Sequence, residues 1–353
     1  MTERGMHTLK EIRGQAKAWA QALHEAQSAL PRIRKLWSQQ DVAEVLFCGC
    51  GSTHYLSLAA AAAFQAETGI RARALPSSEV FLFPDIAIPP GKSLLVTISR
   101  SGETTETVRA AKAFAERKGK DSVLVITCYG QSTLAGLTAA PLIASAAQEQ
   151  SYAQTASFSS MLVLALSLIG EVAGRPALAQ ALHTLPERGE LLVSERIEEA
   201  MRRLGADERY QRFFFLGSGP NYGLACEGML KLKEMSVSPS EAYHFLEFRH
   251  GPRSMVNDRS LVIGLLSDRA TQEEVSMLAE IQKLGAHIMV IGESPSQLGT
   301  LKPEYAVWVE SGLPETLRGP LYLPPMQYLA YYHAMHKGLN PDRPTNVEAV
   351  IYI

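Results

Sequence analysis

The sequence predicts an α/β protein made of two tandem doubly wound parallel-sheet domains, with helices on both faces of each sheet. Two observations carry this prediction. Short apolar runs alternate with helical segments along the chain, which is typical of parallel strands joined by helices. The same pattern also occurs twice at a nearly constant offset, which indicates a tandem duplication.

Three strand-like runs recur in the same order. A run around Phe47 ends in Gly-x-Gly and leads into helical sequence, and a run around Phe215 does the same 168 residues later. Each copy reads as strand, turn, helix, strand, turn, helix and strand. The other two pairs of runs are offset by 167 and 165 residues: 93–96 with 260–263, and 123–126 with 288–291.

The remaining segments flank these copies. Residues 8–37 have a mostly helical pattern and are expected to form an outer arm, while the Ala- and Leu-rich residues 155–173 close the first copy. Residues 185–190 are the linker candidate, because they contain Pro186 and Gly189. We expect an N-terminal helical arm at 1–40, a first domain at 41–184, a second domain at 191–339 and a C-terminal tail at 340–353.

Composition excludes several classes of protein. With 34 basic and 36 acidic side chains the net charge is −2, and the absence of a basic stripe argues against nucleic acid as a partner. The longest apolar stretch, 161–169, is too short to span a bilayer, and the start at Met1–Gly5 lacks a secretory apolar core. Four cysteines make no disulfide framework. We expect a soluble cytoplasmic protein with no membrane partner.

The sharpest candidate for ligand binding is the turn at residues 97–107. A strand-like run stops there, a glycine allows a tight turn and a helix begins, so free N–H groups and the helix dipole favour an anion. The hydroxyls of Ser99, Ser101 and Thr104 can donate to phosphate oxygens, and Arg100 can add a charged fork. Serine and threonine also cap helices for structural reasons, so this turn alone supports capping equally well.

A second turn of this kind lies at residues 49–54, with two glycines and two hydroxyls, although a plain strand-to-helix turn explains it as well. The corresponding turns of the second copy are poorer. Residues 217–221 lose one hydroxyl, and residues 266–271 lack glycine and contain Asp268, which would repel phosphate. The first copy is therefore expected to keep the anion site.

The second copy carries candidate acid–base groups. Glu227, Lys231 and Glu234 fall on one face of a predicted helix, where a solvated charged stripe is the alternative. His250 lies in a Gly-Pro turn among arginines and could shuttle a proton, although a lone histidine is more often structural or exposed. No cluster has metal-ligand spacing, so neither a metal nor another cofactor is expected.

Together these motifs resemble a known family. The turn at 99–104, the helix motif at 227–234 and His250-Gly251-Pro252 are similar to the double-SIS phosphosugar isomerases and deaminases, above all to the isomerase half of glucosamine-6-phosphate synthase. The resemblance covers the chain from about residue 44 and implies two SIS domains of flavodoxin-like fold. It also implies a homodimer with a shared active site, because the family's histidine comes from the neighbouring subunit.

The resemblance implies a role for each matching residue. Glu234 would be the base that moves a proton between C1 and C2 of the sugar, with Lys231 beside it, and His250 would open the sugar ring. Residues 149–155 would line the sugar. The residues expected to bind the phosphosugar are Gly51, Ser52, Thr53, Ser99, Arg100, Ser101, Thr104, Tyr152 and Gln154.

Three departures from the family refine this expectation. The family usually has Gln at the position of Arg100, so phosphate attraction should be stronger here. The synthase begins with a glutaminase domain whose nucleophile is an N-terminal Cys, whereas this chain has Thr2 and little length beyond the repeats. The tail lysine that forms a Schiff base in the synthase matches Ala349. Glutamine-dependent transfer is therefore not expected.

The leading hypothesis is an amino-sugar-phosphate deaminase/isomerase that converts glucosamine-6-phosphate to fructose-6-phosphate and ammonia. A ketose/aldose-phosphate isomerase or a deglycase acting on another phosphosugar is the alternative enzyme. A non-catalytic phosphosugar sensor is the alternative outside enzymes, which Ala349 favours and which Glu234 and His250 oppose.

Overall fold

The computed structural model describes residues 4–353. Residues 1–3, on which the expectations about Thr2 and the start of the chain partly rest, lie outside the described residues. The chain divides into two compact units, each described here by itself. The β1–β5 unit comprises residues 14–149, 154–186 and 348–353, and the β6–β10 unit comprises residues 4–13, 150–153 and 187–347.

The β1–β5 unit contains a five-stranded parallel sheet in the order β2-β1-β3-β4-β5. Its central strands are fully buried, as parallel strands covered on both faces should be. The strands are β1 (Glu44–Gly49), β2 (Arg71–Pro76), β3 (Ser93–Ser99), β4 (Val123–Thr127) and β5 (Leu142–Ile143). The helices are α2 (Gln15–Ser38), α3 (Ser52–Thr68), α4 (Ser77–Leu82), α5 (Pro84–Ala87), α6 (Thr105–Lys118), α7 (Ala156–Val172) and α8 (Pro176–Leu182).

The β6–β10 unit contains a second parallel sheet in the order β10-β9-β8-β6-β7. Its strands are β6 (Arg212–Gly217), β7 (Ser240–Tyr243), β8 (Ser260–Leu265), β9 (His287–Gly292) and β10 (Tyr305–Trp308). Its helices are α1 (Met6–Arg13), α9 (Leu185–Leu192), α10 (Glu195–Gly205), α11 (Pro220–Ser236), α12 (Thr271–Lys283) and α13 (Gly319–His336).

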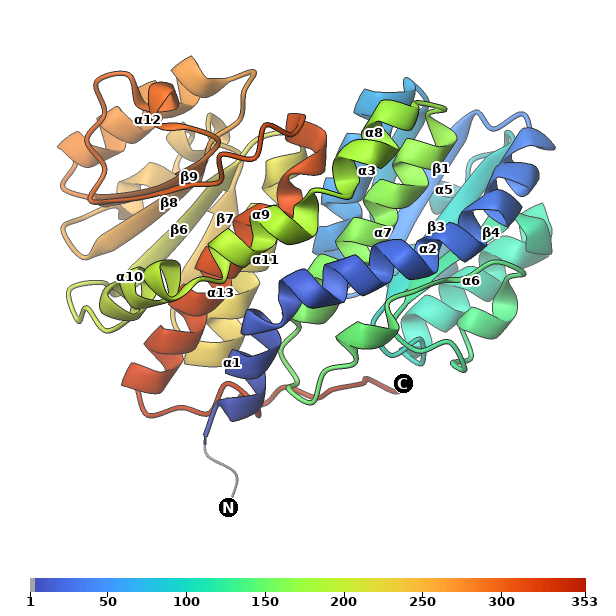
Figure 1. Ribbon diagram of the computed structural model, residues 1–353, viewed down its shortest axis with the longest axis horizontal. Helices are drawn as coiled ribbons and strands as arrows, with labels where there is room; N and C mark the ends of the chain where they lie inside the picture. The colour runs from blue at the N-terminus through green and yellow to red at the C-terminus, as the bar shows by residue number, and fades with distance from the viewer. Residues whose placement is uncertain (1–3) are drawn as a thin grey trace. The chain divides into compact units, whose positions relative to one another are not determined.

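The predicted fold class is confirmed, and both sheets have the same topology (Figure 1). Counted from the first strand of each copy, both follow the order 2-1-3-4-5, which is that of flavodoxin-like folds. The register also repeats, because Phe47 pairs with Val96 and Phe215 pairs with Ile263, 167 residues further on. In such sheets, ligands bind beyond the carboxyl ends of the strands.

The edge strands differ from the predicted three-strand copies. Strand β2 alternates arginine and alanine and is at most half buried, while β5, β7 and β10 are only two to four residues long. Short or charged edge strands carry little hydrophobic signal, because one side of an edge faces solvent. Residues 185–190, the linker candidate, belong to helix α9, where Pro186 stands in the first turn and needs no hydrogen-bond donor.

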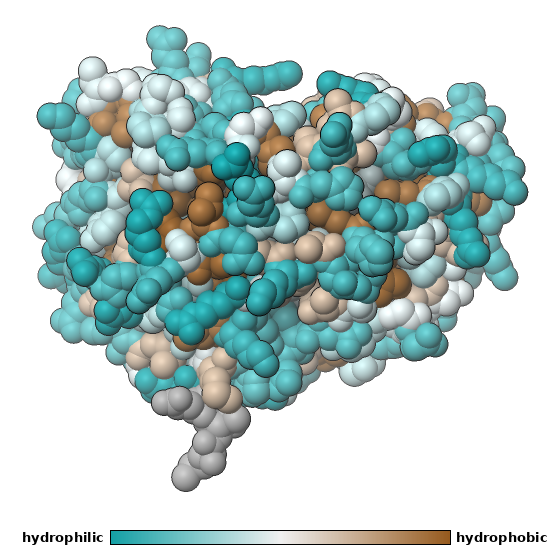
Figure 2. Space-filling model, viewed as in Figure 1, coloured by the Kyte–Doolittle hydropathy of each residue, from teal (hydrophilic) through white to brown (hydrophobic). Residues whose placement is uncertain are grey.

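The surface is mostly hydrophilic on the face shown in Figure 2, with apolar side chains gathered in small patches. The apolar side chains lie inside, in separate clusters around each sheet. Among residues 4–353, no helix is both long and apolar enough to cross a membrane.

Candidate active site

The β3–α6 turn has the geometry of an anion site. Gly102 has a φ of +66°, and a Cβ atom there would lie 2.1 Å from the Ser132 hydroxyl, so only glycine fits. Leu134 donates its N–H to the Gly102 carbonyl at 3.0 Å and ties the turn to the segment after β4. The chain therefore enters α6 with its N–H groups directed outward from the carboxyl edge of the sheet.

The hydroxyls of this turn have protons left to donate. Ser99 Oγ accepts the Gly102 N–H at 3.1 Å, and Ser101 Oγ accepts the Glu103 N–H at 3.1 Å. Thr104 is the N-cap of α6 but makes no side-chain cap bond. A hydroxyl that accepts one hydrogen bond can still donate its own proton, so capping and phosphate binding are compatible in this turn.

Arg100 is placed differently from the expectation of a free phosphate fork. Its side chain is 8% exposed and lies 3.5 Å from the Glu149 carboxylate. Its Nη2 also donates to the carbonyl of Ala349 at 2.9 Å. The guanidinium is therefore engaged within the β1–β5 unit.

The β1–α3 turn lies at the end of the neighbouring strand. Gly51 has a φ of +55°, and Thr53 Oγ1 accepts the Cys50 N–H at 2.9 Å while donating to the Cys50 carbonyl at 3.0 Å. Ser52 and Thr53 are buried and Gly51 is exposed. The Thr53 side chain therefore closes its own turn, and the exposed main chain of this turn is what can approach an anion.

The segment at 149–155 begins and ends in the β1–β5 unit. Glu149 accepts the N–H and the hydroxyl of Thr155, both at 2.7 Å, and the hydroxyl of Ser157. Gln154 Oε1 is buried and has no hydrogen-bond partner among the described residues. A buried unpaired amide oxygen costs free energy, which a donating sugar hydroxyl would recover.

Tyr152 belongs to the β6–β10 unit and is held there by the C-terminal segment. Its N–H donates to the Asp342 carbonyl at 3.1 Å, and the Arg343 guanidinium lies 4.0 Å above its ring. Ser151 beside it donates its hydroxyl to Glu11 of α1. Nothing in the sequence indicated these contacts, since they join residues more than 130 positions apart.

Helix α11 places three ionisable groups in one buried row. Lys231 Nζ lies 2.5 Å from Glu234 and 3.4 Å from Glu227, and the side chains of Lys231 and Glu227 are each 1% exposed. The Glu234 side chain is 20% exposed. This burial excludes the solvated charged stripe. It leaves one partly accessible carboxylate held by a buried ammonium group.

His250 lies on the other face of the same sheet. Phe214 packs on Phe248, which joins a core cluster with residues of α12, and Arg249 pairs with Glu280 of α12. Side chains alternate along a strand, so the neighbouring Phe213 points to the opposite face, where it packs on His333 of α13 beside α11. The exposed His250 and Glu234 of one chain are therefore not brought together.

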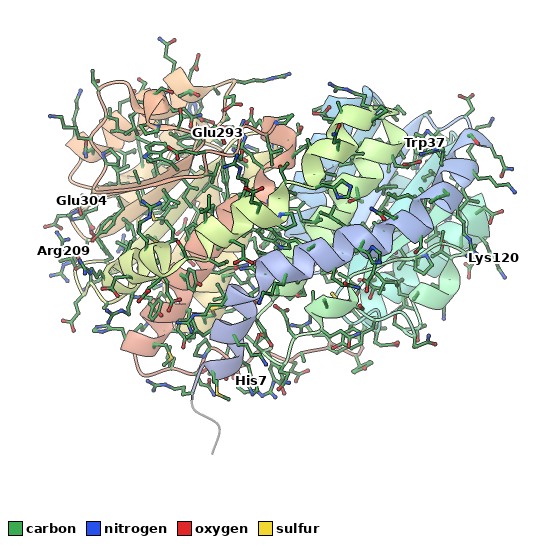
Figure 3. All side chains as sticks on the ribbon, in the orientation of Figure 1. His7, Trp37, Lys120, Arg209, Glu293 and Glu304 are labelled. Atoms are coloured by element: carbon green, nitrogen blue, oxygen red, sulfur yellow. The ribbon has the colours of Figure 1, made fainter. Side chains whose placement is uncertain are left out.

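The corresponding turn of the second copy is filled by its own side chains. Asp268 accepts Arg318 Nη1 at 3.0 Å, and Glu293, labelled in Figure 3, lies 3.3 Å from the same guanidinium. Glu274 accepts the Ser267 N–H at 2.7 Å, and burial raises the pKa of this carboxyl. Acidic groups already occupy this turn, which agrees with the expectation that the first copy keeps the anion site. No cluster able to hold a metal ion occurs among the described residues.

The comparisons with known proteins match both copies. A family model for the SIS domain matches residues 40–169 and 208–333. The chain belongs to the SIS domain family. The chain is 30% identical to glutamine–fructose-6-phosphate aminotransferase [isomerizing] of Pyrococcus horikoshii over 98% of its length, and 31% identical to that of Pseudomonas aeruginosa over 90%. It spans only 58% and 52% of these relatives, somewhat more than half their length.

Solved structures agree on the fold of this SIS protein. Glucosamine-6-phosphate deaminase of Thermotoga maritima matches with a TM-score of 0.72 and 26% identity over 94% of this chain and 99% of that one. Tagatose-6-phosphate ketose/aldose isomerase of Escherichia coli matches with a TM-score of 0.84 and 23% identity, over 96% and 95% of the two chains. The second likeness shows the fold alone.

Proposed function

We propose that this SIS protein binds a phosphorylated amino sugar in the β3–α6 turn and isomerises it, converting glucosamine-6-phosphate and water to fructose-6-phosphate and ammonia. The phosphate would accept hydrogen bonds from Ser99, Ser101 and Thr104 and from the free N–H groups of the turn. The Gln154 oxygen would accept one from a sugar hydroxyl. We keep the cytoplasm as the expected location.

The observation that carries the proposal is the row of Glu227, Lys231 and Glu234 on α11. A buried ammonium between two carboxylates costs desolvation energy, and binding alone would not require it. It fixes the Glu234 carboxylate as an oriented base, which is what moving a proton between C1 and C2 requires. The sensor alternative needs only the turn.

We further propose that the active protein is a homodimer whose site takes His250 from the neighbouring subunit. The support is the position of Phe248 and Phe213 on opposite faces of the second sheet, which separates His250 from Glu234 within one chain. An open-chain sugar is needed before C2 can lose its proton, and a histidine brought from the partner could open the ring.

The test is to incubate the purified protein with glucosamine-6-phosphate and to measure both ammonia and fructose-6-phosphate. We expect both products in equal amounts, and a loss of about 10²-fold or more in Glu234→Gln. Glu199→Gln on exposed α10 is the matched control and should keep full activity. Unchanged turnover in Glu234→Gln would overturn the role of this residue.

A ketose/aldose-phosphate isomerase is the second candidate, supported by the likeness to the tagatose-6-phosphate isomerase fold. A panel of ketose and aldose phosphates separates the two, because the isomerase would convert them without releasing ammonia. Binding of these sugars without any turnover would favour the sensor.

A further inference from the structure

Arg100 joins two parts of the β1–β5 unit that are far apart in sequence. Its guanidinium lies beside Glu149, and its Nη2 donates to the carbonyl of Ala349 in the tail, 249 residues away. A bond from a charged donor is roughly twice as strong as a neutral one. The fork is thus divided between a buried carboxylate and a main-chain oxygen of the tail.

Glu149 keeps this guanidinium in place. Its side chain is 1% exposed, and both of its oxygens accept hydrogen bonds from Thr155 and Ser157 at the start of α7. A carboxylate held by three donors besides the arginine has little freedom to move. Arg100 is therefore aimed by a fixed partner.

The tail has few other attachments to this unit. The Ile351 carbonyl accepts the N–H of Thr105, the first residue of α6, at 3.3 Å, and the Ile353 N–H donates to Thr105 Oγ1 at 3.3 Å. Ile351 and Ile353 are 51% and 71% exposed, so apolar burial contributes little. Of these three bonds, the bond from Arg100 is the shortest and has the charged donor.

We propose that Arg100 is a positioning residue that acts through the tail. Braced by Glu149, it holds the carbonyl of Ala349 and so keeps residues 349–353 against the β3–α6 turn, at the end where the phosphate of the proposed substrate would bind. This changes the role expected from sequence, in which Arg100 attracts phosphate directly. The consequence for sugar binding rests on the proposed function, whereas the hold on the tail does not.

The first arm of the test needs no sugar. Backbone amide exchange is measured in the full chain and in Arg100→Gln, with Arg117→Gln as the control because Arg117 pairs with exposed Asp85 at the far end of α6. We expect Arg100→Gln to speed exchange of the Thr105 amide at least about tenfold, as for the loss of one charge-assisted hydrogen bond, and the control to leave it unchanged. Unchanged protection of Thr105 in Arg100→Gln would overturn the proposal.

The second arm is a double-mutant cycle on the dissociation constant for glucosamine-6-phosphate. Its members are the full chain, Arg100→Gln, a chain ending at Glu348, and the two changes combined. Residues 349–353 belong to no helix or strand and are largely exposed, so their removal leaves the fold intact. If Arg100 acts through the tail, the combined change weakens binding no more than either single change. If it binds phosphate directly, the effects multiply, and the proposal fails.

Two further outcomes are decided in advance. If Arg100→Gln does not fold, Arg100→Lys keeps a charge beside Glu149 without the second Nη group, and the same pattern is expected. If the full chain does not bind glucosamine-6-phosphate, the failure belongs to the proposed function, and Thr105 exchange alone decides the role of Arg100.

Discussion

Lys231 is the residue on which the site most depends. Its ammonium group is buried between Glu227 and Glu234. We expect Lys231→Met to lower the free energy of unfolding by about 3–5 kcal/mol, because it leaves Glu227 buried without its cation. Denaturant unfolding measures this loss. The double variant Lys231→Met/Glu227→Gln should recover part of it, and no recovery would contradict the account.

Gly102 gives a second prediction at this scale. With a φ of +66° and Ser132 Oγ 2.1 Å from the position of a Cβ atom, Gly102→Ala must shift the turn. We expect a loss of at least about 1–3 kcal/mol in stability and loss of phosphosugar binding, read by thermal unfolding with and without glucosamine-6-phosphate. Gly119→Ala at the end of α6 has open space around it and is the control for positive φ alone.

Residues close in sequence could be predicted, and distant partners could not. The spacing of Glu227, Lys231 and Glu234 puts them on one helical face, and the structure pairs them. Burial of Lys231 does not follow from that spacing. The bond from Arg100 to Ala349 depends on where the chain folds back, which no local pattern indicates.

At the scale of elements, the start of α12 differs from the start of α6 through Glu274. Burial raises the pKa of this carboxyl, so the folded chain binds its proton more tightly than the unfolded chain does. Its contribution to stability is therefore lost as the pH rises from the unfolded pKa through the folded one. We expect Glu274→Gln to raise Tm at pH 7, and the difference to vanish toward pH 4. An equal or lower Tm at pH 7 would contradict this.

The central strands could be predicted and the edges could not. Strands β1, β3 and β4 and their copies are continuous buried apolar runs, and periodicity alone reveals them. Strand β2 reads RARALP and β7 only SEAY, because edge strands need less apolar surface. The repeat offset could have located β7, had the second copy been searched for a partner of β2.

At the scale of the whole molecule, the proposed dimer predicts complementation. Glu234→Gln and His250→Ala homodimers should each be nearly inactive. Subunit exchange at equal amounts should restore up to about a quarter of wild-type activity, because half of the dimers are mixed and each of these has one intact site. A mixture no more active than its parents, or an active protein that sediments as a monomer, would contradict the shared site.

The central claim is that Glu234 moves a proton between C1 and C2 of a phosphosugar bound in the β3–α6 turn. The most direct measurement is nuclear magnetic resonance of the product formed from glucosamine-6-phosphate in deuterium oxide. The account predicts fructose-6-phosphate with solvent deuterium at C1, formed by the wild-type protein and not by Glu234→Gln. Unchanged glucosamine-6-phosphate, or equal labelling by both proteins, would contradict it.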